Sequence, residues 1–155
     1  MRLALALVAL LSATAVQAEA PTLHRLDGDD PLSFAGRPRV LIFWRADCPP
    51  CLVELRNAGA YVEAAGSSGQ VMFVGLQEPA ALRRAAARLS LPPEATAWTD
   101  GDAETVLAAY GGSRALPFAA ILAPSGEVCL RHQGLLGTDL LRHGLRTCGG
   151  GDARD

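Results

Sequence analysis

The hydrophobic positions of the chain fall into short continuous runs separated by polar segments. The runs 40–44 and 70–76 are rich in β-branched and aromatic residues, which favours strands buried on both faces. Residues 118–122 and 127–132 flank an Ala-Pro-Ser-Gly turn, which predicts a β-hairpin. Weaker patterns predict one short strand over 95–99 and two short edge strands within 21–34, around an Asp-Gly turn.

Apolar residues at helical spacing occupy the segments between these runs. One helix is predicted after residue 51 and up to the glycines and serines at 66–69, from Leu52, Leu55, Gly59 and Val62. Further helices are predicted over 80–89, over 103–110, and from a cap at Thr138 to about Arg146. Strands that alternate with helices predict a single α/β domain whose sheet is covered on both faces.

The first 18 residues have the pattern of a secretory signal peptide. Arg2 is followed by an almost wholly apolar stretch over 3–16, and a small-x-small pattern ends at Ala18. Cleavage after Ala20 would place Pro21 beside the cut bond, so Ala18 is favoured. We therefore expect a signal peptide over 1–18 and one domain over 19–155, with an uncleaved membrane anchor as the alternative.

Export changes how the composition is interpreted. The 155 residues are 50% hydrophobic, which is typical of a globular domain, and a formal charge of −2 argues against nucleic acid as a partner. No second apolar stretch is long enough to span a membrane, so a cleaved chain is expected in the periplasm or outside the cell. Four cysteines in an oxidising compartment indicate disulfides before zinc.

Cys48 and Cys51 follow the first buried run directly and precede a predicted helix. Cys48 is therefore expected near the helix N-cap, with Pro49 at the first helical position, where its missing N–H costs nothing. The helix dipole and unpaired N–H groups there stabilise a thiolate, which Cys51 can resolve from one turn along the helix. A structural disulfide or a metal site are the alternatives, but the first stabilises little and the second lacks two ligands at a suitable spacing.

Two stretches resemble the thioredoxin superfamily, and specifically its periplasmic TlpA/ResA-like branch. In PLSFAGRPRVLIFWRADCPPCLVEL the matching positions are Phe43, Trp44, Cys48, Pro50, Cys51 and Glu54. In YGGSRALPFAAILAPSGEVCLRHQG, Pro117 matches the cis-proline that faces the cysteine pair in that family. The resemblance implies a thioredoxin fold, with a central mixed β-sheet and helices on both faces.

The resemblance also implies roles for particular residues. Cys48 is the nucleophile, Cys51 resolves, and Pro117 shapes the substrate groove. Glu54 is a partly buried acid that handles protons for the pair, with an exposed helix carboxylate as the alternative. Substrate contacts are expected from Trp44, Pro49, Pro50 and the Leu116 backbone, with packing beneath the site as the alternative for Trp44.

Two departures from the family pattern affect the expected redox direction. Asp47 replaces a tryptophan before the first cysteine, and an anion there should raise the pKa of Cys48. Pro49 removes a backbone donor from the surroundings of the thiolate. A less stable thiolate is a poorer leaving group and gives a more stable disulfide, so we expect a reducing pair.

The other two cysteines, Cys129 and Cys148, lie in the last predicted strand and just after the last predicted helix. A structural disulfide, two free thiols and a second redox pair that passes electrons to Cys48 all remain open at this point. His132 and His143 are interpreted as surface residues rather than copper ligands.

Together these features predict a periplasmic thiol–disulfide oxidoreductase. By resemblance it reduces protein disulfides, for example in cytochrome c maturation, and receives electrons from a membrane thiol donor. No dissociable cofactor and no metal are required. The alternatives are a disulfide oxidase or isomerase, and a copper-binding chaperone that uses the two cysteines.

Overall fold

The computed structural model describes residues 21–28, 30–32 and 36–150. Within them, six strands form one sheet in the order β1-β4-β3-β2-β5-β6. Their bounds are β1 (Leu23–Arg25), β2 (Arg39–Trp44), β3 (Gln70–Gly75), β4 (Thr96–Thr99), β5 (Phe118–Leu122) and β6 (Val128–Gln133). The β2–β3 and β3–β4 pairs are parallel and the other pairs are antiparallel, so the sheet is mixed, as the resemblance implied.

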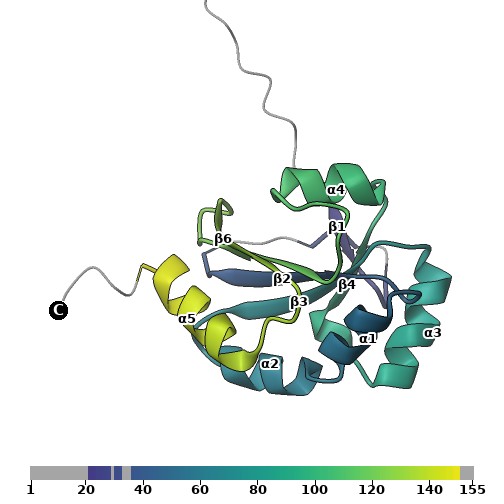
Figure 1. Cartoon of the computed structure of the whole chain (residues 1–155), viewed down its shortest axis with the longest axis horizontal. Helices are drawn as coiled ribbons and strands as arrows, with labels where there is room; N and C mark the ends of the chain where they lie inside the picture. The colour runs from purple at the N-terminus through teal and green to yellow at the C-terminus, as the bar shows by residue number, and fades with distance from the viewer. Residues whose placement is uncertain (1–20, 29, 33–35, 151–155) are drawn as a thin grey trace, which may run out of the picture.

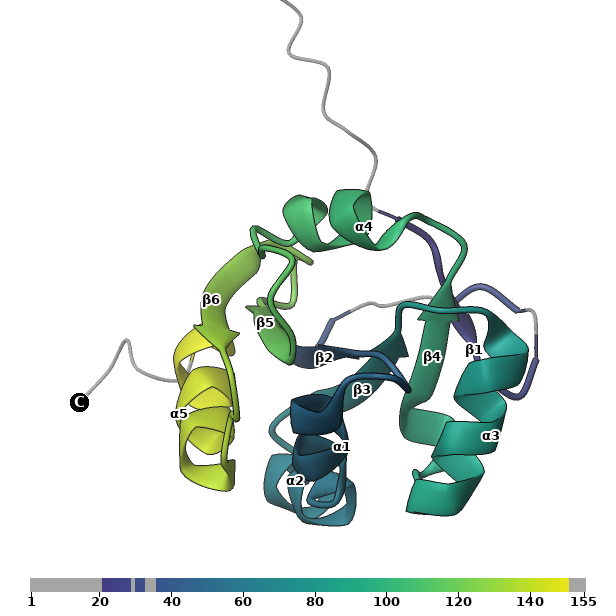
Figure 2. The same cartoon turned by 45° about the vertical axis from the view of Figure 1, so that its right-hand side comes forward.

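Helices cover both faces of this sheet (Figures 1 and 2). They are α1 (Pro49–Leu55), α2 (Ala58–Ala65), α3 (Pro79–Leu89), α4 (Ala103–Ala109) and α5 (Thr138–Cys148), with a short 3-10 helix over Pro93–Ala95. Side chains of β2 alternate between two cores, because successive residues of a strand point to opposite faces. Ile42 packs among residues of α1, α2, α3 and α5, whereas Phe43 packs on the other face with residues of α4.

The prediction of a single helix after residue 51 is wrong, because α1 and α2 are separate helices. Arg56 and Asn57 both bond the carbonyl three residues back, which closes the end of α1, and Asn57 caps α2. Asparagine and glycine at 57 and 59 are poor helix formers, which explains a break at this point. Leu52 and Val62 are only partly buried and Gly59 is exposed, so the buried stripe differs from the predicted one. It consists of Cys51, Glu54, Leu55, Ala58, Tyr61 and Ala65.

The ends of the chain differ from expectation in smaller ways. Gly137 is the N-cap of α5, Thr138 is its first residue, and the helix reaches Cys148. Among the described residues before β2, β1 is the one strand, and Pro31 makes an isolated bridge to His24. The rest of the second predicted edge strand and the predicted signal peptide lie outside the described residues. No described helix has the length and apolar character needed to cross a membrane.

Candidate active site

Cys48 lies where the central strand β2 gives way to helix α1. All six residues of β2 are buried, and the chain then turns through residues 45–47 before α1 begins at Pro49. Cys48 has extended backbone angles and is the N-cap, and its carbonyl accepts the first helical bond from the Leu52 N–H at 3.1 Å. The local sequence explains this, because proline is favoured at the first helical position and cannot continue a strand ladder.

The two sulfur atoms form a disulfide, with Cα atoms 5.2 Å apart. Cys48 is partly exposed and Cys51 is fully buried, so an approaching thiol or disulfide meets the Cys48 sulfur first. The Cys51 N–H donates to Cys48 Sγ at 3.2 Å. Pro49 and Pro50 carry no N–H, so Cys51 is the first helical residue that can offer a backbone donor to this sulfur. The sequence analysis counted the missing N–H of Pro49 but not that of Pro50, although the Pro-Pro dipeptide is visible in the sequence.

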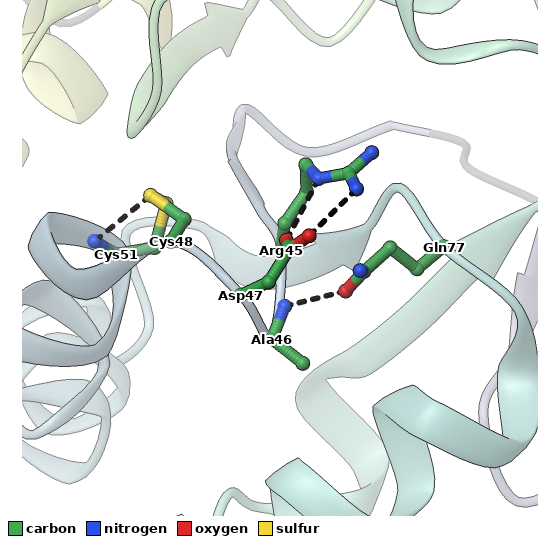
Figure 3. Close-up of polar contacts among 6 residues, drawn as sticks. All are labelled: Arg45, Ala46, Asp47, Cys48, Cys51 and Gln77. Atoms are coloured by element: carbon green, nitrogen blue, oxygen red, sulfur yellow. Dashed lines mark hydrogen bonds and ion pairs between the residues drawn. A yellow bond between two sulfur atoms is a disulfide. The ribbon is translucent and has the colours of Figure 1, made fainter.

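Asp47 is paired with a cation that the sequence analysis overlooked. Arg45 donates from Nε to Asp47 Oδ1 and from Nη2 to Oδ2, each at 2.9 Å. Figure 3 shows the carboxylate turned toward Arg45 and away from the sulfur atoms. The hydrogen bond from Arg45 lowers the pKa of Asp47, so the carboxylate is ionised at neutral pH but compensated. The expected opposition between Asp47 and a Cys48 thiolate is therefore weaker than Asp47 alone would give.

The same turn is anchored to the next strand by Gln77. The Ala46 N–H donates to Gln77 Oε1 at 2.6 Å, and Gln77 follows the end of β3 (Figure 3). The Leu76 N–H donates to the Trp44 carbonyl at 3.0 Å beside it. The segment that leads into Cys48 is thus held by an adjacent parallel strand. No local pattern identifies Gln77, because this contact joins residues 31 positions apart.

Glu54 lies one turn beyond Cys51 and is buried, with 1% of its surface exposed. Its Oε1 accepts a hydrogen bond from the Leu136 N–H at 2.9 Å, and its Oε2 has no partner among the described residues. The neighbouring Tyr61 hydroxyl accepts from the Gly137 N–H at 3.1 Å. Burial raises the pKa of Tyr61 to about 12, and the charge of Glu54 adds to the increase. The alternative of an exposed helix carboxylate at Glu54 is wrong.

Pro117 lies at the same end of the sheet as Cys48. Phe43 pairs with Phe118 in the antiparallel β2–β5 ladder, so Pro117 precedes β5 beside the end of β2. The Leu116–Pro117 peptide bond is cis, Pro117 is buried and Leu116 is partly buried. The Leu116 N–H and carbonyl make no hydrogen bond to another described residue, and they are therefore available to a ligand.

Gln133 holds the segment around Pro117 and was not identified from the sequence. Its Nε2 donates to the Ala115 carbonyl at 3.0 Å and to the Pro117 carbonyl at 2.8 Å. The Gly134 N–H also donates to the Pro117 carbonyl, at 2.9 Å. Both carbonyls beside Leu116 are thereby tied to the end of β6. Gln133 is the last residue of β6 and lies one position beyond the predicted strand over 127–132, so the strand pattern did not identify it.

Trp44 packs beneath the site, which is the alternative stated for it in the sequence analysis. Its side chain is completely buried in the core, and its indole N–H has no partner among the described residues. The fully buried strand carries it beneath the site, where it supports the turn that follows. Pro49 and Pro50 are exposed beside Cys48, as a substrate contact requires.

Cys129 and Cys148 form a second disulfide, with Cα atoms 5.8 Å apart. Val128 pairs with Leu122 and Leu122 pairs with Arg39, so Cys129 lies near the start of β2, whereas Cys48 follows its end. A direct relay from this pair to Cys48 within one molecule is therefore not supported. His132 Nε2 lies 2.9 Å from the Leu135 carbonyl. In the part of the chain that the structure describes, no three His, Cys, Asp or Glu side chains are grouped to hold a metal ion.

No protein-family model and no curated protein matches the chain. Among solved structures, it is 27% identical to dsbF of MTB (Mycobacterium tuberculosis), with a TM-score of 0.59 over 80% of this chain and 91% of that one. The exposed lipoprotein thioredoxin Etrx1 of Streptococcus pneumoniae has 21% identity and a TM-score of 0.65 over 81% and 96%. A thiol:disulfide interchange protein of Bacteroides sp. has 21% identity and a TM-score of 0.68 over 92% and 93%.

These likenesses extend over most of the chain and agree with its mixed six-stranded sheet. The chain has the thioredoxin fold, and its likeness to dsbF and to the thiol:disulfide interchange proteins places it in the thioredoxin superfamily, among thioredoxin-like oxidoreductases.

Proposed function

We propose that this protein is exported and reduces disulfides of other proteins through the Cys48–Cys51 pair. The observation that carries the proposal is the unequal exposure of the two bonded cysteines. Cys48 is partly exposed, Cys51 is buried, and both lie beyond the end of the central strand. An exposed attacking sulfur with a protected partner suits exchange in which only one cysteine meets the client.

The reaction begins from the reduced pair. The Cys48 thiolate attacks one sulfur of a client disulfide, the client S–S bond breaks, and the released client thiolate takes up a proton. The Cys51 thiolate then attacks Cys48 Sγ, which frees the second client thiol and closes the Cys48–Cys51 disulfide. Two electrons have passed to the client. A membrane thiol donor would return them by a second exchange.

Neighbouring groups support these steps. An extended client segment can pair with the free Leu116 N–H and carbonyl, flanked by Pro49 and Pro50. Glu54 lies one turn from Cys51 and has an unpartnered carboxylate oxygen, so it can take the proton that Cys51 loses. A Cys51→Ala variant should accumulate a mixed disulfide through Cys48, whereas Cys48→Ala should not.

The reducing direction is supported by how few donors surround the Cys48 sulfur. Two prolines occupy the positions that would otherwise supply the first helical N–H groups, and only the Cys51 N–H reaches the sulfur within the described residues. A thiolate with fewer donors is less stable, and the disulfide is correspondingly harder to reduce. The pairing of Asp47 with Arg45 removes part of the earlier argument, but it leaves the contribution of the prolines intact.

The test is the reduction potential of Cys48–Cys51 in protein that carries Cys129→Ser and Cys148→Ser. The protein is equilibrated with dithiothreitol or glutathione, and the free thiols are alkylated and read by mass. A value near or below about −230 mV places the pair with thioredoxin-like reductants. A value above about −180 mV places it with isomerases and oxidants, and the proposed direction is then wrong.

Export, periplasmic location and a role such as apocytochrome c reduction are further parts of the proposal. They are supported by the signal-like residues 1–18 and by the exposed lipoprotein among the similar structures. N-terminal sequencing of the protein recovered from a periplasmic fraction tests the export and the cut after Ala18. Recovery of intact chain in the membrane fraction would support the anchored alternative.

A further inference from the structure

The Arg45–Asp47 pair lies in the turn that leads into Cys48, and exchange chemistry as such does not require it. The two side chains form two parallel hydrogen bonds, each 2.9 Å long. Such two-point contacts between guanidinium and carboxylate are stronger and more directional than a single bond. Both side chains remain open to solvent, at 38% and 60% exposed, so the contact is not a by-product of core packing.

The backbone beneath the pair is held as well. The Ala46 N–H donates to Gln77, and the Cys48 N–H donates to the Arg45 carbonyl at 3.3 Å. Backbone and side chains together define where the Asp47 carboxylate lies, which is on the side of the turn away from the sulfur atoms (Figure 3). The residue adjacent to the nucleophile therefore carries a negative charge that is both turned aside and compensated.

We propose that Arg45 is a positioning residue that holds the Asp47 carboxylate away from Cys48 and cancels its charge. The reduced Cys48 sulfur then faces a neutral pair rather than an anion. The inference rests on the proposed function only in taking Cys48 as the reactive thiol. It adds a tuning device that the two cysteines and the prolines do not provide.

The charged residues of the neighbouring elements are the same in every variant of this pair. Glu54 lies in α1 and is buried against the loop before α5, where it accepts from the Leu136 N–H. Beyond Arg45, on the side of the β3–α3 and β4–α4 loops, the acidic residues that line a cavity with it are Glu78, Asp100 and Asp102. Arg45 is the basic residue among the described residues that line this cavity, and it also pairs with Asp47.

The proposal predicts shifts of opposite sign for the two single variants. Arg45→Gln leaves the Asp47 charge uncompensated and should raise the pKa of Cys48 by about 0.5 unit. Asp47→Asn leaves the Arg45 charge uncompensated and should lower the Cys48 pKa by a similar amount. The double variant should return to within about 0.2 unit of the parent protein, because the net charge of the pair is zero in both.

The measurement is the pH midpoint of iodoacetamide alkylation at Cys48 in the fully reduced protein, followed by mass. Arg142→Gln is the matched control. It also removes one arginine from an exposed pair, with Asp139 in α5, and should leave the midpoint unchanged. Arg45→Lys keeps the charge without the two-point contact, so its midpoint should lie closer to that of the parent protein than to that of Arg45→Gln. The shifts should shrink in about 1 M salt, because exposed charges are screened.

Equal midpoints in both single variants, shifts of the same sign, or a shift in Arg142→Gln as large as in Arg45→Gln would each overturn the inference. The readout needs no client protein, so it is independent of the proposed reaction. A protein with opposite shifts but no reductase activity would keep the inference and lose the function. A reductant without these shifts would do the reverse.

Discussion

The Cys48–Cys51 disulfide lies beyond the last residue of β2, whereas the Cys129–Cys148 disulfide lies near the first residue of that strand. Cys129 is on the hairpin strand beside that end, and Gly149, the residue after Cys148, lies against Pro38. The first pair closes a loop over a separation of 3 residues, and the second joins strand to helix over a separation of 19. The second pair therefore restrains far more of the unfolded chain, while the first restrains little.

The surroundings of the two bonds differ as much as their loop lengths. Cys48 is an N-cap with two exposed prolines beside it, and a buried partner can displace whatever becomes attached to it. Cys129 lies on a sheet edge, and Cys148 closes the last turn of α5. We therefore expect the Cys48–Cys51 bond to serve exchange and the Cys129–Cys148 bond to serve cross-linking, and the predictions below test this division.

The largest expected effect is on exchange activity. Cys48→Ser should reduce turnover of a disulfide-containing peptide by at least about a thousandfold, because the reactive thiolate is gone. Cys129→Ser/Cys148→Ser should remain within about twofold of the parent protein. The assay follows peptide reduction with dithiothreitol as electron donor. Substantial loss in the second variant, with its fold intact by circular dichroism, would break the comparison.

For stability, the Cys129–Cys148 pair should matter more than the Cys48–Cys51 pair. Cys129→Ser/Cys148→Ser should lower the free energy of unfolding by about 3 kcal/mol, because the closed loop is long. Cys48→Ser/Cys51→Ser should lower it by less, about 2 kcal/mol or under, because the loop is short. Urea unfolding of both variants, fitted with a common slope, gives the two values. A larger loss from the Cys48–Cys51 variant would contradict the division.

Variants of Glu54 show whether this side chain contributes to stability, to the exchange reaction, or to both. Glu54→Ala leaves the buried Leu136 N–H without an acceptor and should cost about 1–3 kcal/mol of unfolding free energy. Glu54→Gln keeps an acceptor and should cost less, but it should slow the resolving step in single-turnover experiments. Equal resolving rates in Glu54→Gln and the parent protein would show that the acid is structural alone.

Gln133 gives the smallest expected effect. Gln133→Ala removes two hydrogen bonds from the segment around Leu116 and should cost about 1 kcal/mol of unfolding free energy. It should also raise KM for a peptide substrate about threefold with kcat retained, which corresponds to a loss of binding alone. Gln70→Ala is the control. It removes an acceptor of Arg39 at the other end of the sheet and should leave KM unchanged.

The elements of this fold were largely predictable because they follow from local patterns. β2 and β3 are continuous apolar runs, and Pro49 marks the first turn of α1. The prediction failed between α1 and α2, where the break depends on small differences in helix propensity rather than on a change in the apolar pattern. There, the weak helix formers at 57 and 59 allow the chain to end one helix and begin another, so that each packs its own apolar face.

Residue chemistry alone identifies the candidate reactive pair, because two cysteines separated by two prolines after a buried strand can be recognised without coordinates. The sequence also shows that Asp47 is adjacent to Cys48 in the chain. It does not state that Arg45 compensates that charge, that Gln77 anchors the turn, or that Gln133 holds the carbonyls beside Leu116. Those contacts depend on side-chain direction and on which strands become neighbours. Periodicity along the chain encodes burial, whereas partners across the sheet are set only when distant segments pack together.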